Sequence, residues 1–194
     1  MSRAAGSGLG RRIALVQRWL MAIYRLDLSL RAERFLLTRE AARRLLPAGS
    51  PRSGLAVVEG GEDLWLGLYL DPRDGADVDT VVEETSHWVC LVWHAAQGRP
   101  VSQLQLELQG EVDRYAVARL NGRDGLRHFR NFRWVSDLDG AARNRYETAH
   151  RTAYRYCRFL AQRYPQRADV PDLLAELRGF YRASAQARLR FGFG

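Results

Sequence analysis

Glutamate and histidine recur at helical spacing in two places. Residues 84–87 (ETSH) and 147–150 (ETAH) both read ExxH. Because residues three apart share one face of a helix, each motif would present a carboxylate oxygen and an imidazole nitrogen to the same point. This pair of donors suits iron, manganese or zinc. The sequence therefore predicts that Glu84, His87, Glu147 and His150 bind a divalent transition metal.

Three further glutamates lie close to the first motif. Glu83 precedes it and shares a helix face with His87, and Glu107 and Glu111 lie one turn apart further along the chain. If helices 81–97 and 101–120 form an antiparallel pair, residue 111 lies level with residues 84–87. We therefore add Glu107 and Glu111 to the predicted metal ligands. Glu83 and Glu84 are the candidate catalytic residues, with Glu83 or Glu107 bridging or acting as a base.

To this extent residues 81–164 resemble the ferritin-like di-metal carboxylate proteins. In that family two helices each supply a Glu-x-x-His and two others each supply a Glu, all facing inward. The resemblance implies a two-metal centre with redox chemistry on iron or manganese. It also requires a Glu from a helix before residue 81, which Glu33 or Glu40 would supply if residues 30–46 formed one helix.

A second resemblance implies hydrolysis. Residues 83–87 (EETSH) are similar to the zincin motif HExxH with Glu in place of the first His. By this resemblance Glu83 and His87 would bind zinc, Glu84 would activate water, and Glu107 or Glu111 would be the third protein ligand. The substrate would be a small molecule or a peptide.

Two interpretations without a metal stay open. The acids and His87 could form a buried polar network with nearby arginines such as Arg114 and Arg145. Alternatively, the Arg-rich chain could bind a partner, because residues 119–134 interleave arginine with aromatic residues, as single-stranded nucleic-acid grooves do. The formal charge of +8 agrees with an acidic partner. All thirty basic residues are arginine, however, which is typical of a GC-rich genome. We expect His128, among these arginines, at the surface.

The pattern of apolar residues predicts the elements that position these side chains. Asp77 and Asp79 would cap the first helix of the pair, and Ser102 the second. A polar connection, 121–140, would be anchored by Phe129, Phe132 and Trp134. The predicted helices are 12–25, 81–97, 101–120, 141–164 and a last one from Asp169 or Asp172 to about Leu189.

The N-terminal half carries the strand signals. Two apolar runs flank Gly60-Gly61, which suits a tight hairpin turn. Residues 30–46 allow two interpretations. Either a short strand at 34–37 precedes a helix, 39–46, capped by Thr38, or the whole segment is one helix.

These elements predict a mainly helical α+β fold, with a small antiparallel hairpin followed by a bundle of about four long helices. We expect a loose tail, 1–10, and one domain, 11–190, with a helix-plus-hairpin part (11–76) and a bundle part (77–190). Cys90 and Cys157 lie in apolar helical patterns, which predicts free thiols in a reducing cytoplasm. No apolar run approaches the roughly 18 residues of a membrane span, so we expect a soluble protein.

Overall fold

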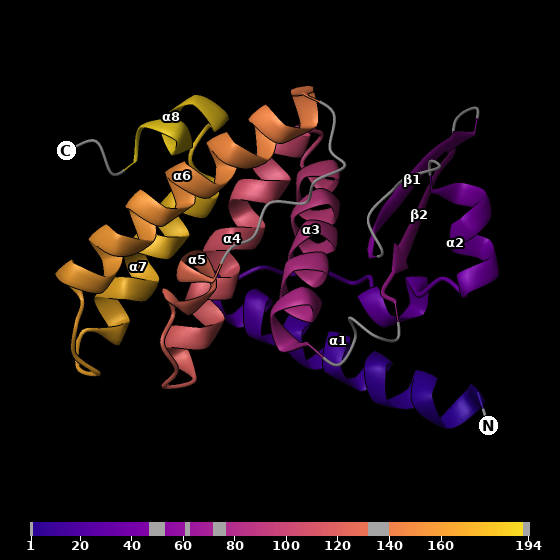
Figure 1. The fold of residues 1–194 in the computed structure, drawn as a ribbon, viewed down its shortest axis with the longest axis horizontal. Helices are drawn as coiled ribbons and strands as arrows, with labels where there is room; N and C mark the ends of the chain where they lie inside the picture. The colour runs from indigo at the N-terminus through magenta and orange to yellow at the C-terminus, as the bar shows by residue number, and fades with distance from the viewer. Residues whose placement is uncertain (1, 47–52, 61–62, 72–76, 132–139, 192–194) are drawn as a thin grey trace.

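The computed structural model describes residues 2–46, 53–60, 63–71, 77–131 and 140–191. It is a mainly helical α+β fold with one small antiparallel sheet in the N-terminal half, as predicted. Figure 1 shows a central pair of helices, α3 and α4, with the sheet on one side and the C-terminal helices on the other. Among the described residues, no helix combines the length and apolar character needed to cross a membrane.

The central pair consists of α3 (Val78–Ala96) and α4 (Gln103–Leu120). The Asp77 carboxylate accepts hydrogen bonds from the first backbone amides of α3, and Ser102 forms a capping box with Gln105 at the start of α4. Gly98, at a φ of 62°, provides the left-handed residue that lets the chain reverse between the two helices. The predicted helix pair and the Asp77 and Ser102 caps are therefore confirmed, whereas Asp79 lies in the first turn of α3.

Helix α1 (Ser2–Tyr24) runs across this pair and buries Ile13, Val16, Leu20 and Ile23 at helical spacing. Figure 1 shows its N-terminal end projecting beyond the other elements. The helix continues back through the Gly/Ser-rich start, which differs from the loose tail expected at 1–10. Once a nucleus exists, each added residue gains a backbone hydrogen bond, which favours this extension although three of its residues are glycine.

Residues 30–46 do not form one helix. They form a 3₁₀ turn, η1 (Ala32–Phe35), and a short helix, α2 (Arg39–Leu45), capped by the Thr38 hydroxyl. Between the two, Leu36 forms a parallel bridge to Leu68. The single-helix alternative is wrong, because backbone pairing to the sheet holds residue 36 extended, and the predicted helix after Thr38 is confirmed. The strand expected at 34–37 is reduced to the bridge at Leu36, since residues 34 and 35 belong to η1.

The hairpin consists of β1 (Gly54–Gly60) and β2 (Asp63–Tyr69), which pair antiparallel with Gly60 opposite Asp63. This confirms the predicted hairpin, although Gly61 lies outside the described residues. Gly67 is needed for close packing, because a Cβ there would lie 2.6 Å from the side chain of Leu37. Leu68 of β2 and Leu70, just after the strand, belong to the core.

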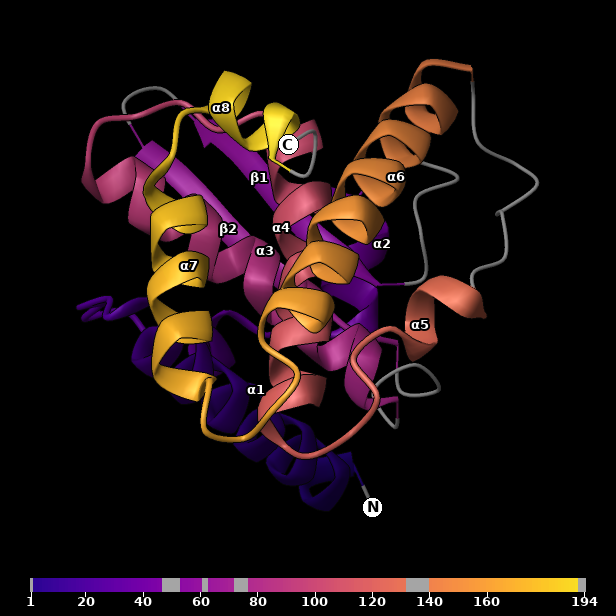
Figure 2. The same cartoon turned by 90° about the vertical axis from the view of Figure 1, so that its left-hand side faces the viewer.

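The C-terminal part contains α5 (Arg127–Arg130), α6 (Gly140–Arg163), α7 (Val170–Arg182) and α8 (Ala185–Arg190). The single last helix predicted to Leu189 is wrong. Ala183 is extended and Ser184 caps α8, so the chain turns and buries Arg188 against Tyr181 and Gln109. Figure 2 shows α8 turned away from the direction of α7. Of the predicted loop anchors, Phe129 is buried, whereas Phe132 and Trp134 lie outside the described residues.

Large aromatic side chains fill the core between these helices. Tyr24 stacks on Tyr181 with ring centroids 4.2 Å apart, and Tyr156 stacks on Phe180 at 4.3 Å. Trp88 is fully buried on α3. Cys90 and Cys157 are both free and buried, in agreement with the predicted small apolar role.

Candidate metal centre

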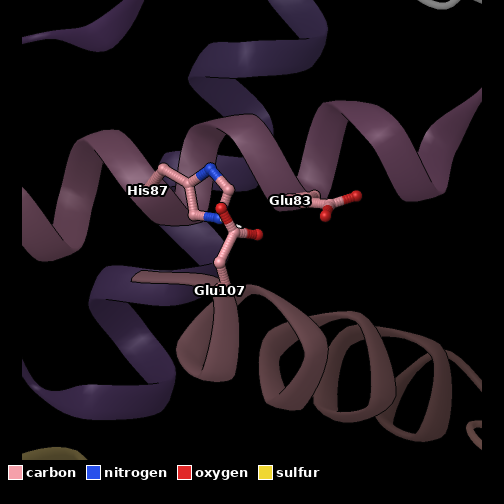
Figure 3. Close-up of side chains that lie close together, drawn as sticks. All are labelled: Glu83, His87 and Glu107. Carbon is pink, nitrogen blue, oxygen red and sulfur yellow. Dashed lines mark ion pairs between the residues drawn. The ribbon is translucent and has the colours of Figure 1, made fainter. Parts of the chain in front are cut away.

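Three predicted site residues converge at the interface of α3 and α4. Each of Glu83, His87 and Glu107 offers one ligand atom, and these atoms all lie within 4.8 Å of one another. Figure 3 shows the His87 ring facing Glu107 across the interface, with Glu83 on the same helix as His87. His87 Nε2 is 3.8 Å from Glu107 Oε2. A carboxylate from each helix and an imidazole can together bind one cation.

The antiparallel helix pair produces this convergence. Glu83 and His87 lie one turn apart on α3, and the closest stretch of α4 contains Glu107 and Gly110. The chain directions oppose, so the acid at residue 107 meets His87 while Arg114 meets Glu83, with Arg114 Nη1 3.3 Å from Glu83 Oε2. The sequence predicted residue 111 level with residues 84–87. In the structure His87 lies opposite Glu107 and Gly110, slightly earlier in α4.

The two nitrogens of His87 have different surroundings. Nδ1 is 3.5 Å from Glu84 Oε2, and neither this oxygen nor Nε2 has a well-aligned hydrogen-bond partner among the described residues. Both side chains are buried, each with 8% of its residue surface exposed. A histidine that ligates a metal usually has its second ring nitrogen held by a carboxylate. Glu84 lies on the Nδ1 side of His87 at ion-pair distance, which leaves Nε2 for a ligand.

Burial of these acids shifts their protonation. Burial raises the pKa of Glu83 to about 7, although Arg114 and His87 oppose the shift. Burial also raises the pKa of Glu107, against His87 and a hydrogen bond from Tyr146. Burial opposes the charging of His87, yet the neighbouring carboxylates raise its pKa to about 10. The cluster thus concentrates negative charge that protons or a cation must neutralise.

Glu111 lies beside this cluster with its own partners. Its Oε1 is 3.0 Å from His150 Nδ1, its Oε2 is 2.8 Å from His128 Nε2, and Arg114 is 3.9 Å away. Burial alone would raise the pKa of Glu111, but these positive or hydrogen-bonding neighbours outweigh it and lower the pKa to about 2. Glu111 is therefore a buried carboxylate that stays ionised.

The second ExxH motif is split between two environments. His150 faces inward to Glu111, whereas Glu147 pairs with the exposed Arg151 at 3.5 Å. Glu40 is exposed and pairs with Arg44. The structure thus brings together Glu83, Glu84, His87, Glu107, Glu111 and His150. It places Glu147 and Glu40 apart from them.

Sequence reasoning missed two members of the cluster. His128, expected at the surface, is buried on α5 with 8% of its surface exposed, so that prediction is wrong. The adjacent Phe129 packs into the bundle and brings His128 with it, with ring centroids 3.9 Å apart. Tyr146, which hydrogen-bonds to Glu107, was not considered. Its position four residues before His150 was the available signal, since such residues share a helix face.

A second buried polar network lies next to the cluster and was also missed. The carboxylate of Asp113 accepts hydrogen bonds from the Ser86 hydroxyl at 2.5 Å, the Gln109 amide at 2.9 Å and the Tyr24 hydroxyl. Arg188 donates to Gln109 from α8. Burial raises the pKa of Asp113 to about 6 despite these hydrogen bonds. The network joins α1, α3, α4 and α8.

No family model matches the sequence, and no curated protein or solved structure is significantly similar to it. The chemistry of the site therefore has to be argued from the arrangement of its own residues.

Proposed function

We propose that the chain is a metal-dependent enzyme that binds a divalent transition metal through Glu83, His87 and Glu107. The observation that supports this most directly is the convergence of the three donors from two helices within 4.8 Å. The buried and unpartnered Nε2 of His87 supports it further, because a buried polar atom without a partner is costly unless a ligand satisfies it.

The donor types favour particular metals and reactions. Two carboxylates and one imidazole suit zinc, manganese or iron. Three protein ligands leave coordination positions open for water and substrate, and a bound metal lowers the pKa of that water enough to make it a nucleophile. We therefore favour hydrolysis over redox chemistry for this site. This choice agrees with the zincin-like resemblance, whose ligand set is Glu83, His87 and either Glu107 or Glu111. The ferritin-like set also needs Glu147.

In this proposal Glu84 is a positioning residue rather than a ligand. Its Oε2 lies 3.5 Å from His87 Nδ1, on the side of the ring away from Glu107. A carboxylate there holds the ring orientation and increases the basicity of Nε2. Tyr146 has the corresponding relation to Glu107, because its hydroxyl hydrogen-bonds to that carboxylate.

Elemental analysis of protein purified without chelator tests the proposal. We expect close to one equivalent or more of zinc, manganese or iron, which His87→Gln and Glu107→Gln each reduce strongly. Glu147→Gln is the matched control. Glu147 forms an ion pair with Arg151, so this substitution should leave the metal content unchanged. Less than about a tenth of an equivalent in the wild type, unchanged after reconstitution with each metal, would reject the proposal.

One observation favours a second, non-enzymatic function. The exposed face of α6 presents Arg151, Arg155 and Arg158 beside Phe159, which is 41% exposed. Arginines next to an exposed ring are typical of surfaces that bind single-stranded nucleic acid. The test is fluorescence anisotropy with a single-stranded RNA at two salt concentrations. Binding that weakens with salt, and that weakens further after charge reversal of the three arginines, would support this function. No binding at low salt would exclude it.

A further inference from the structure

Glu111 and His128 have an unusual relation for a buried carboxylate and imidazole. They are 6% and 8% exposed, and Glu111 Oε2 lies 2.8 Å from His128 Nε2. Despite this short distance the contact falls outside the geometry of a well-aligned hydrogen bond. Neither atom has another hydrogen-bond partner among the residues that the structure describes.

This geometry is expected of two ligands that share one cation. Nitrogen and oxygen ligands lie about 2.0–2.2 Å from a zinc-like ion, so two adjacent ligand atoms are about 3 Å apart. The lone pair of each ligand atom points at the ion and not at the other ligand. The two atoms are therefore close together without the alignment of a hydrogen bond. A simple ion pair would instead direct the N–H at the carboxylate.

The surroundings of this pair agree with a built site. His150 Nδ1 lies 3.0 Å from the other oxygen of Glu111 and fixes the orientation of the carboxylate. The Phe129 ring packs against both imidazoles, with centroids 3.9 Å from His128 and 5.2 Å from His150. Of the four residues of α5, the buried ones are His128 and Phe129. The short helix α5 thus places one imidazole and the apolar ring that packs against it in the interior.

We propose that Glu111 and His128 are the ligands of a second cation site, with His150 as the residue that orients Glu111. The cation would be a divalent transition metal that accepts nitrogen and oxygen ligands, such as zinc or manganese. The site uses none of Glu83, His87 and Glu107, so it stands independently of the first. Arg114 lies 3.3 Å from Glu83 and 3.9 Å from Glu111, which makes the two sites neighbours.

Calorimetric titration of the metal-free, full-length protein with Zn²⁺ tests this proposal, with elemental analysis of the loaded protein as a second readout. We expect two equivalents for the wild type and one for His128→Gln. His150→Gln should weaken the second equivalent by about 10-fold to 100-fold. His87→Gln should remove the other equivalent and keep this one. Glu147→Gln is the matched control and should bind two.

The result separates the two sites. If the wild type binds one equivalent, and this is lost in His87→Gln but kept in His128→Gln and His150→Gln, the second site does not exist and the first stands. If one equivalent is lost in His128→Gln and kept in His87→Gln, the second site is established and the first is rejected. No binding by the wild type overturns both. Far-ultraviolet circular dichroism identifies any variant that fails to fold, and the stoichiometry of the wild type decides in that case.

Discussion

Gly110 and His87 fit together because Gly110 has no side chain. A Cβ at residue 110 would lie 2.9 Å from Nε2 of His87 and 3.4 Å from Cγ of Glu83. Glycine inside a helix is less favourable than alanine by up to about 1 kcal/mol. Its position in the middle of α4, opposite the proposed ligands, therefore gives the imidazole and the carboxylate room at a cost in helix stability.

Gly110→Ala should weaken metal binding at the first site. The added methyl group would push the His87 ring away from Glu107, so we expect the affinity for Zn²⁺ at that site to fall by at least about 10-fold, as for other changes that misorient a ligand. Calorimetric titration measures the change.

Gly179→Ala in α7 is the matched control, since nothing lies within 4 Å of a Cβ there. It should stabilise the protein by about 0.5–1 kcal/mol and leave the affinity unchanged. An unchanged Zn²⁺ affinity in Gly110→Ala would show that Nε2 of His87 does not bind the ion.

Much of the fold could be predicted because local signals in the sequence were strong. The Asp77 and Ser102 caps bound the two central helices, and Gly60-Gly61 separated the two runs of the hairpin. Helical spacing also placed Glu83, Glu84 and His87 together, and the antiparallel pair brought Glu107 to them. These predictions depend on neighbours in sequence or on one short connection.

The features that could not be predicted depend on tertiary packing, which no local sequence pattern encodes. His128 is buried because Phe129 packs into the bundle, and a loop rich in arginine gave no sign of this. The last helix breaks at Ala183 so that Arg188 can reach Gln109, which is 79 residues away in sequence. Glu147 shares the ExxH spacing with Glu84, but His150 of α6 faces inward to Glu111 while Glu147 pairs with Arg151 of the same helix.

Substitution of Glu84 should distinguish a positioning role from a ligand role. If Glu84 only orients His87 through Nδ1, Glu84→Ala should lower the Zn²⁺ affinity by about 10-fold to 100-fold. Glu84→Gln keeps an oxygen that can accept from Nδ1–H and should recover most of the affinity. Glu107→Ala should abolish binding at the first site. Equal losses in all three variants would make Glu84 a ligand.

The buried Asp113 should give the unfolding free energy a specific dependence on pH. Its pKa is raised from an ordinary value of 3.8 to about 6 in the folded protein, chiefly by burial. A group whose pKa is higher in the folded state stabilises the protein below the unfolded pKa, and this contribution is lost as the pH rises through the folded pKa. The wild type should therefore lose a stabilising contribution between about pH 4 and pH 7 that Asp113→Asn lacks.

Urea unfolding at several pH values measures this dependence. The free energy of unfolding of the wild type minus that of Asp113→Asn should fall across this interval and become constant above it. A constant difference between the wild type and Asp113→Asn would contradict the raised pKa.

Tyr24→Phe should destabilise the network around Asp113. The substitution removes a donor to Asp113 and the oxygen that accepts from Gln109 at 3.1 Å, while the ring can keep its stacking on Tyr181. Loss of one partner in a buried network costs about 1–3 kcal/mol. Fewer hydrogen bonds to the charged form should also raise the pKa of Asp113 further above 6. Urea unfolding and carboxyl NMR titration measure the two effects.

Ser86→Ala completes a double-mutant cycle with Tyr24→Phe. Ser86 donates to the other oxygen of Asp113, so each variant removes one hydrogen bond to the same carboxylate. Residues in one hydrogen-bonded network usually show coupling of about 0.5–3 kcal/mol. We therefore expect the change in unfolding free energy of the double variant to differ from the sum of the two single changes by at least about 0.5 kcal/mol. Simple additivity would mean that Asp113 does not couple α1 to α3.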